Sequence, residues 1–381
     1  MQKTVLIRVL TTVLVGLFLQ LNGYAEAASQ WLPRDEGVTV SGEGDNLVYQ
    51  LSRGYLDYTG DDVDNVVLDF EMQTPGDRSF FYLYFRQQDN REGEVVYIRN
   101  HKPNAPDTLQ YSPVFQGRSA WQLYHGEKGT APAAFSANTW TKVRIVVQDQ
   151  SLSIWVGDSE TPVMQQVKLQ HPIRKGGMSF RGNIPRGSVA PYTAKIRNIQ
   201  VGSLSTLSET ERPSRDTGEP QSSNSSHKRV MQFQVSEAFE AAKSPDVDLQ
   251  QLRQSLSFEV INADEGGMVE LLKHRTIPAN ARAWGAVLES TLVAPREMQC
   301  QIALGFSDTV AVFLNDGALA FSDASYRYTN NRQEGIFHES QLQLFLPLNK
   351  GPNTLSSVVT DSFGGWGYQL TLINCEGVKP M

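Results

Sequence analysis

The chain has 381 residues, of which 40% are hydrophobic, 20% charged and 9% aromatic, a composition that supports folded cores and excludes a disordered or fibrous protein. At about 150 residues per domain, this length predicts two domains. The formal net charge of -7 and the pI of about 5.5 argue against a nucleic-acid partner, because phosphate binding needs a basic face.

The first 28 residues predict a cleaved signal peptide. Lys3 and Arg8 precede an apolar run at residues 9–21 and give this segment a positive start. Ala25-Glu26-Ala27 then has the small-any-small form of a cleavage site. The run is shorter than the roughly 20 residues of a membrane-spanning helix, so no membrane span is expected. We therefore expect the mature protein to be secreted or periplasmic.

Residues 29–202 predict a β-sandwich built from short strands. Gly, Pro, Asn and Asp separate the apolar segments, and no long helical period is present. The expected strands are residues 46–51, 66–72, 80–86, 94–99, 122–124, 141–148, 151–156, 177–181 and 194–201.

Polar side chains and flat rings gather between Tyr97 and Gly126, where aliphatic residues are scarce. A polar, flat-faced ligand such as a sugar needs this combination, so the stretch is a poor candidate for core. The rings expected to stack on sugar are Tyr111, Trp121 and Tyr124. The side chains expected to hydrogen-bond hydroxyl or carboxylate groups are Arg99, His101, Gln110 and His125.

Residues 203–229 predict a flexible linker, because apolar residues almost vanish there and Ser, Pro, Glu and Arg dominate. Residues 230–381 predict a second β-rich domain. Helical character is expected at residues 237–243 and 249–258. The expected strands are residues 230–235, 267–272, 283–292, 298–306, 310–314, 341–347, 354–360 and 367–373.

Two local features of the second domain carry further predictions. Asn315-Asp316-Gly317 predicts a tight hairpin turn, because Asn and Gly tolerate the positive φ that such turns need. Cys300 and Cys375 allow either a disulfide, in an exported protein, or two buried free thiols. They have no His at ligand spacing, which argues against a zinc site.

The first domain resembles the concanavalin A-like (laminin G-like) jelly rolls of bacterial exported proteins. The resemblance covers residues 31–202 and is most specific between Arg99 and Gly126, including QYSPVFQGRSAWQLYHG at 110–126. It implies two stacked antiparallel sheets, and its relatives mostly bind glycans and less often cleave them.

The second domain is similar to galactose-binding-like jelly-roll modules over residues 230–373. The resemblance rests on LGFSD at 304–308, VFLNDG at 312–317, LPLNKGPN at 346–353 and FGGWG at 363–367. Such modules usually attach to sugars or pack on a neighbouring domain. Trp366 is a candidate ligand platform, although core packing is the favoured interpretation of this ring.

Catalytic patterns are incomplete in this chain. Asp69 and Glu71 share one face of an expected strand, as do acids of the endo-glucanase branch of the first fold, but that branch has a third acid upstream where Val67 stands here. The pattern favours two acids on a solvent face. A lyase needs a Tyr or His base beside a cation, and the candidate binding residues would serve for that as well as for binding.

The sequence thus predicts an all-β protein with two jelly-roll domains that binds a glycan or polysaccharide mainly through the first. No catalytic residue, metal ligand or cofactor is assigned, although a structural calcium ion is compatible with either jelly roll. The alternatives are a polysaccharide lyase or glycoside hydrolase that uses the same cleft, and an adhesion protein that binds a protein partner through the second domain.

Overall fold

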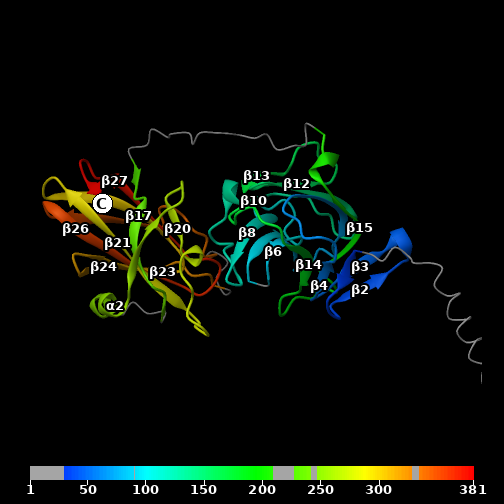
Figure 1. The fold of residues 1–381 in the computed structure, drawn as a ribbon, viewed down its shortest axis with the longest axis horizontal. Helices are drawn as coiled ribbons and strands as arrows, with labels where there is room; N and C mark the ends of the chain where they lie inside the picture. Colours follow the sequence, from blue (N-terminus) through cyan, green and yellow to red (C-terminus); the bar gives the residue numbers. More distant parts are fainter. Residues whose placement is uncertain (1–29, 90, 209–226, 242–246, 328–333) are drawn as a thin grey trace, which may run out of the picture.

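The computed structural model describes residues 30–89, 91–208, 227–241, 247–327 and 334–381. The predicted signal peptide and most of the predicted linker lie outside the described residues. The described strands form four antiparallel sheets, two built only from residues 31–202 and two only from residues 228–380 (Figure 1). We call these two parts the N-terminal half and the C-terminal half. The chain is all-β, as the sequence predicts.

The N-terminal half is a jelly-roll sandwich of two sheets. Sheet 1 runs in the order β1 (Trp31–Pro33), β4 (Tyr55–Tyr58), β14 (Gly177–Asn183), β6 (Phe80–Gln87), β7 (Gly93–Ile98), β8 (Leu109–Phe115) and β10 (Thr130–Ala131), with β9 (Arg118–Ser119) paired to β8. Sheet 2 runs in the order β13 (Met164–Lys168), β12 (Ser151–Val156), β11 (Thr141–Gln148), β5 (Val66–Gln73), β15 (Ala194–Gly202), β3 (Val48–Leu51) and β2 (Val38–Ser41).

The core of this half lies between the two sheets. Phe81 and Phe180 of sheet 1 contact Phe70 of sheet 2, with ring centroids 6.2 and 5.1 Å apart. Alternate residues of each strand point into this core, so the residues between them face outward.

The C-terminal half also has two sheets. Sheet 3 runs in the order β16 (Lys228–Arg229), β27 (Gly367–Asn374), β22 (Met298–Phe306) and β25 (Leu342–Leu348), with β20 (Met268–Glu270) paired to β27. Sheet 4 runs in the order β19 (Phe258–Asn262), β17 (Gln232–Ser236), β21 (Trp284–Ala294), β26 (Gly351–Asp361), β23 (Thr309–Leu314) and β24 (Gly317–Asp323), with β18 (Phe239–Glu240) and β28 (Lys379–Pro380) paired to β21.

Helical elements are short. Helix α2 (Leu249–Ser255) packs on the outer face of sheet 4, and the Asp248 side chain caps it by accepting from the Gln251 amide. Single 3-10 turns form η1 (Gly44–Asn46), η2 (Gly126–Lys128), η3 (Leu204–Thr206) and η4 (Leu271–Lys273). No helix among the described residues is both long and apolar enough to cross a membrane.

Most expected strands are confirmed to within a few residues, and the hairpin at Asn315 and Asp316 is confirmed with φ angles of 49° and 69°. The structure joins Cys300 and Cys375 in a disulfide. Residues 249–255 are helical, as expected, whereas Phe239 and Glu240 form a strand where the sequence predicts a helix.

Three further expectations are wrong. Residues 122–124 form a turn rather than a strand. Residues 109–115 belong to the stretch judged a poor candidate for core, yet they form the fully buried strand β8. The first residues of the predicted linker are structured, because Leu207 packs against Val67, Val146 and Trp155. At the other end of the linker, β16 pairs with β27.

The two halves pack against each other along the β8 side of sheet 1, while β2 and β3 lie at the far end (Figure 1). Gln122 forms two backbone hydrogen bonds across the seam, donating to the Gly364 carbonyl at 2.8 Å and accepting from the Phe337 amide at 2.9 Å. Gly364 has a φ of +97°, and a Cβ there would overlap the Gln122 side chain. The close approach of the halves therefore needs glycine at this position.

Candidate functional site

The outer face of sheet 1 carries tyrosine rings. Side chains alternate along β6, so Tyr82 and Tyr84 point away from the core that Phe81 and Phe85 fill. Flat rings on the outer face of a sheet add nothing to the core between the sheets. This face is the first candidate for a binding site.

Strand register aligns these side chains in one row. Tyr82 pairs with Tyr97 on one side and with Arg181 on the other, and Arg181 pairs in turn with Tyr55. We call the following set the tyrosine face: Tyr55, Tyr82, Tyr84, Tyr97 and Arg181. All five side chains are partly exposed.

The rings enclose the guanidinium of Arg181. Its Cζ lies 5.1 Å from the Tyr55 ring centroid and 5.5 Å from that of Tyr82, and its Nη1 donates to Tyr84 Oη at 3.4 Å. The Tyr82 and Tyr97 centroids are 4.8 Å apart at 67°. Within the described part of the chain, no carboxylate forms an ion pair with Arg181. The site therefore combines ring faces with a cation whose donors remain available.

Burial keeps the phenols of this face neutral. It raises the pKa of Tyr82 to about 12, with the neighbouring Tyr84 adding to the shift, and it raises the pKa of Tyr97 well above the ordinary value. The Tyr97 hydroxyl also hydrogen-bonds the Ser119 hydroxyl. At neutral pH these groups act as hydrogen-bond donors and acceptors rather than as bases.

Residues 120–125 close the β8 end of the tyrosine face. Gln110, the strand partner of Tyr97, donates from its side-chain amide to the Trp121 carbonyl at 2.6 Å and to the Tyr124 carbonyl at 2.9 Å, and it accepts from Arg99. These contacts bury Gln110 completely. Gln110 thus positions the segment that carries Trp121 and is itself closed to a ligand.

Three rings expected to bind ligand are buried. Tyr111 donates to the Glu94 carboxylate at 2.7 Å inside the N-terminal core, and Tyr124 donates to the Glu270 carboxylate of the C-terminal half at 2.6 Å. Trp366 has no exposed surface and donates to a backbone carbonyl at 3.2 Å. A ring without an exposed face cannot stack on a sugar, so the expected stacking role of Tyr111 and Tyr124 is corrected, and for Trp366 core packing is confirmed.

Three of the four remaining candidates lie near the same edge. Trp121 and His125 are partly exposed, with ring centroids 6.1 Å apart. Arg99 is mostly buried and donates to the Asp107 carbonyl at 2.9 Å. His101 lies apart from them, with Nδ1 2.9 Å from the Ser79 carbonyl.

Both histidines are neutral at physiological pH. Burial, reinforced by the charge of Arg99, lowers the pKa of His125 to about 4, and its Nε2 has no hydrogen-bond partner among the described residues. Burial also lowers the pKa of His101. Neither imidazole is therefore a strong base at neutral pH.

The prediction from the sequence missed Tyr55, Tyr82, Tyr84 and Arg181. A signal was present for two of them, since β6 alternates the aromatic and aliphatic residues of the core with tyrosines. The segment contains apolar side chains on both faces, so its sequence does not tell which face is covered.

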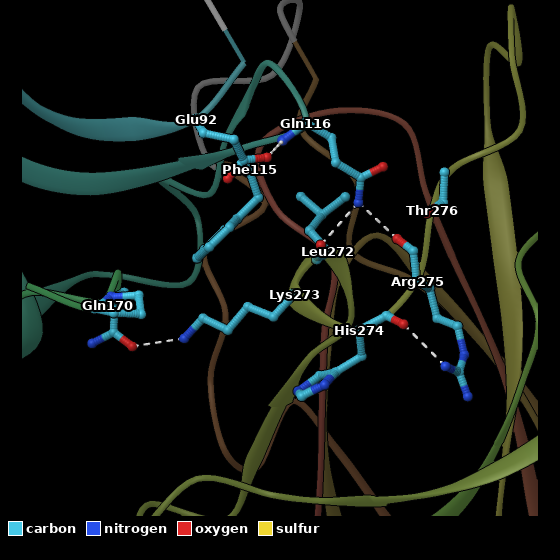
Figure 2. Close-up of a pocket in the computed structure, with 10 residues that line it drawn as sticks. Glu92, Phe115, Gln116, Gln170, Leu272, Lys273, His274, Arg275 and Thr276 are labelled. Carbon is cyan, nitrogen blue, oxygen red and sulfur yellow. Dashed lines mark hydrogen bonds between the residues drawn. The ribbon is translucent and has the colours of Figure 1, made fainter. Parts of the chain in front are cut away.

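A hollow lies on the seam between the halves and has a volume of about 460 Å³ (Figure 2). Gln116 crosses it, donating to the Leu272 and Arg275 carbonyls at 2.9 and 2.7 Å, and Lys273 donates to Gln170 at 2.8 Å. Lys273 also pairs with Glu270 at 3.1 Å. The hydrogen bonds of Gln116 and the Lys273–Gln170 bond cross the seam, so the hollow serves the packing of the halves.

The acids on sheet 2 are ion-paired on its outer face. Asp69 pairs with Arg144 and Glu71 with Arg197, both at 2.7 Å, which fits the expectation of two solvent-facing acids. In the ranges that the structure describes, no group of three or more His, Cys, Asp or Glu side chains is arranged to hold a metal ion. The structural calcium ion stays a prediction.

Three solved structures are similar to less than half of this chain. The carbohydrate-binding module CBM66 from Bacillus subtilis is 12% identical, covers 46% of this chain and 96% of its own, and has a TM-score of 0.34. A Bacillus subtilis protein with a galectin-like fold is 9% identical, with 45% and 88% covered and a TM-score of 0.34. A tetrameric galectin from the ball sponge Cinachyrella is 13% identical, with 39% and 98% covered and a TM-score of 0.29.

No curated protein matches the chain. A family model matches residues 20–201, which include the whole tyrosine face. Over these residues the chain is similar to the 3-keto-alpha-glucoside-1,2-lyase-like domain.

Proposed function

We propose that the protein is an exported carbohydrate-binding protein that holds a glycan on the tyrosine face. The observation that carries the proposal is the row of partly exposed rings around Arg181, on a sheet face that the core does not need. Tyrosine offers an apolar ring for the C–H face of a sugar and a hydroxyl for its oxygens. This half is similar to a domain whose description names an α-glucoside, and this similarity supports a sugar as the ligand.

In this proposal Tyr82 and Tyr84 stack on the sugar, and Arg181 donates to hydroxyl or carboxylate oxygens. The neighbouring rings shield the guanidinium from water, which strengthens its hydrogen bonds. Trp121 keeps its place as a stacking residue at the β8 end, and His125 as a hydrogen-bonding one.

The C-terminal half is proposed to be a galactose-binding-like accessory module. Its packing against residues 120–125 supports this role, because the contact supports the wall of the candidate site. An adhesion protein that binds a protein partner through this half is the alternative.

A second candidate function is cleavage of an α-glucoside by elimination, and the matched family description favours it. Such a lyase needs a base near the scissile bond. The described groups beside the tyrosine face offer a phenol with a pKa of about 12 and an imidazole with a pKa of about 4, both far from neutrality. This chemistry favours binding over cleavage.

The experiment that tests the proposal is a glycan array with residues 29–381, run beside Tyr82→Ala and Tyr192→Ala. Tyr192 is a partly exposed tyrosine off the tyrosine face and serves as the matched control. We expect the first variant to lose binding and the second to keep it. Silence of the unchanged protein, or equal binding by both variants, would contradict the proposal.

The same protein tests the lyase. Incubation with a 3-keto-α-glucoside, followed by chromatography of the products, is expected to leave the substrate intact. A product that accumulates with time, and that Tyr82→Ala abolishes, would establish cleavage on this face.

A further inference from the structure

A second group of aromatic rings is assembled from both halves of the chain. Trp121 of the N-terminal half has its ring centroid 5.8 Å from Tyr326 and 6.0 Å from Phe363, and these two rings of the C-terminal half lie 5.8 Å apart. We call these three residues the aromatic rim. Two segments of the C-terminal half thus meet one segment of the N-terminal half.

The aromatic rim continues the row of the tyrosine face. Tyr97 pairs with Gln110 in the sheet, and the Gln110 side chain donates to the Trp121 carbonyl at 2.6 Å. From β4 to β8 the row crosses four strand spacings, roughly 19 Å at about 4.8 Å each. The rim lies beyond that end, so the two groups of rings together suit an extended ligand rather than a single sugar.

Packing of the halves does not account for the exposed part of the rim. Phe363 is 45% exposed, and Trp121 and Tyr326 are partly exposed. Beside the rim, the halves are joined by the backbone hydrogen bonds of Gln122 and by the buried Tyr124–Glu270 pair. Exposed aromatic surface rimmed by polar residues marks a ligand or partner site in soluble proteins.

We infer that the aromatic rim is a second sugar subsite, built from both halves, which takes further rings of an oligosaccharide whose first rings lie on the tyrosine face. The inference rests on the proposed function and names its ligand as an α-linked gluco-oligosaccharide of more than two rings. The C-terminal half then contributes directly to binding through Tyr326 and Phe363.

Titration calorimetry with maltose and maltoheptaose tests the inference on residues 29–381. The variants are Phe363→Ala, Phe363→Tyr, which keeps a ring, and Tyr82→Ala. Phe345→Ala is the matched control, because Phe345 is a 66% exposed phenylalanine on β25 of the same half.

We expect the unchanged protein to bind maltoheptaose more tightly than maltose. Phe363→Ala should weaken maltoheptaose binding about threefold to tenfold, because one aromatic contact contributes about that much to the affinity. The same change should leave maltose binding unchanged. Phe363→Tyr should restore the affinity, Phe345→Ala should have no effect, and Tyr82→Ala should weaken both ligands.

Each other outcome has a definite meaning. If Phe363→Ala binds both sugars as the unchanged protein does, or weakens both equally, the second subsite is refuted while the tyrosine face stands. If the unchanged protein binds neither sugar, the α-glucoside form of the proposed function fails, and this inference fails with it. Thermal midpoints of all variants identify any that fail to fold. If Phe363→Ala fails to fold, the affinity of Phe363→Tyr for maltoheptaose decides whether the subsite stands.

Discussion

Glu94 is a carboxylate buried completely in the core of the N-terminal half, and its replacement by glutamine gives a sharp test of the structure. Its Oε2 accepts from the Tyr111 hydroxyl at 2.7 Å and its Oε1 accepts from the His171 amide at 3.0 Å. Burial nevertheless raises the pKa of Glu94 from 4.5 to about 7, because these bonds and the charge of Arg86 only partly replace water.

The raised pKa fixes the sign of a pH dependence. The folded state holds the proton of Glu94 more tightly than the unfolded state, so its stabilising contribution is complete below pH 4.5 and is lost as the pH rises to about 7. At 1.36 kcal/mol per pH unit, the free energy of unfolding should fall by about 3 kcal/mol over this window. Above it, the contribution of Glu94 is constant.

Glu94→Gln removes the ionisation and should flatten this part of the curve. Glutamine has only one acceptor oxygen, so either the Tyr111 hydroxyl or the His171 amide loses its acceptor, which costs about 1–2 kcal/mol at every pH. The variant should therefore be less stable than the unchanged protein at pH 4.5 by about that amount, and more stable at pH 8 by about 1–2 kcal/mol.

Urea unfolding at pH 4.5, 6 and 8, followed by tryptophan fluorescence, measures the effect. Glu127→Gln is the control, because Glu127 is exposed. Parallel curves of unfolding free energy against pH for the unchanged protein and Glu94→Gln would refute the assignment of a raised pKa to this carboxyl group.

Three further changes test the C-terminal half and the seam. Replacing Cys300 and Cys375 by serine opens a loop of sequence separation 75 and should cost about 4 kcal/mol, so an unchanged thermal midpoint would contradict the disulfide. Gln116→Ala removes three hydrogen bonds between the halves and should split the calorimetric unfolding peak in two; a single unshifted peak would refute its joining role. Gly364→Ala should have a thermal midpoint well below that of Gly351→Ala, because Gly351 has a similar φ of +94° but open space around it. Equal midpoints of the two variants would argue against the close approach of the halves at Gly364.

The candidate site was predictable only in part. Trp121 and His125 were recognised as polar and aromatic residues in a stretch poor in aliphatic ones, and both lie at the edge of the tyrosine face. Tyr111 and Tyr124 belong to the same stretch, but each donates its hydroxyl to a buried carboxylate. Tyr111 donates to Glu94, and Tyr124 donates to Glu270. Composition identifies side chains able to bind a sugar, and it does not distinguish them from side chains that bind another part of the protein.

The strands themselves were visible in the sequence because their signals are local. Short apolar segments separated by turn residues predicted the strands Thr141–Gln148 and Ser151–Val156 with their observed bounds, and Asn315 and Asp316 predicted the hairpin that follows β23. Each of these signals depends on the conformational preferences of a few consecutive residues.

Which face of sheet 1 meets solvent was decided by tertiary structure. Tyr82 and Phe81 are neighbours on one strand, and Phe81 is core only because sheet 2 brings Phe70 against it. Phe363 lies far along the chain from Trp121, and the two rings are in contact because the two halves pack against each other. Short-range preferences set the strands, whereas burial and the meeting of distant rings depend on contacts between segments that no local pattern encodes.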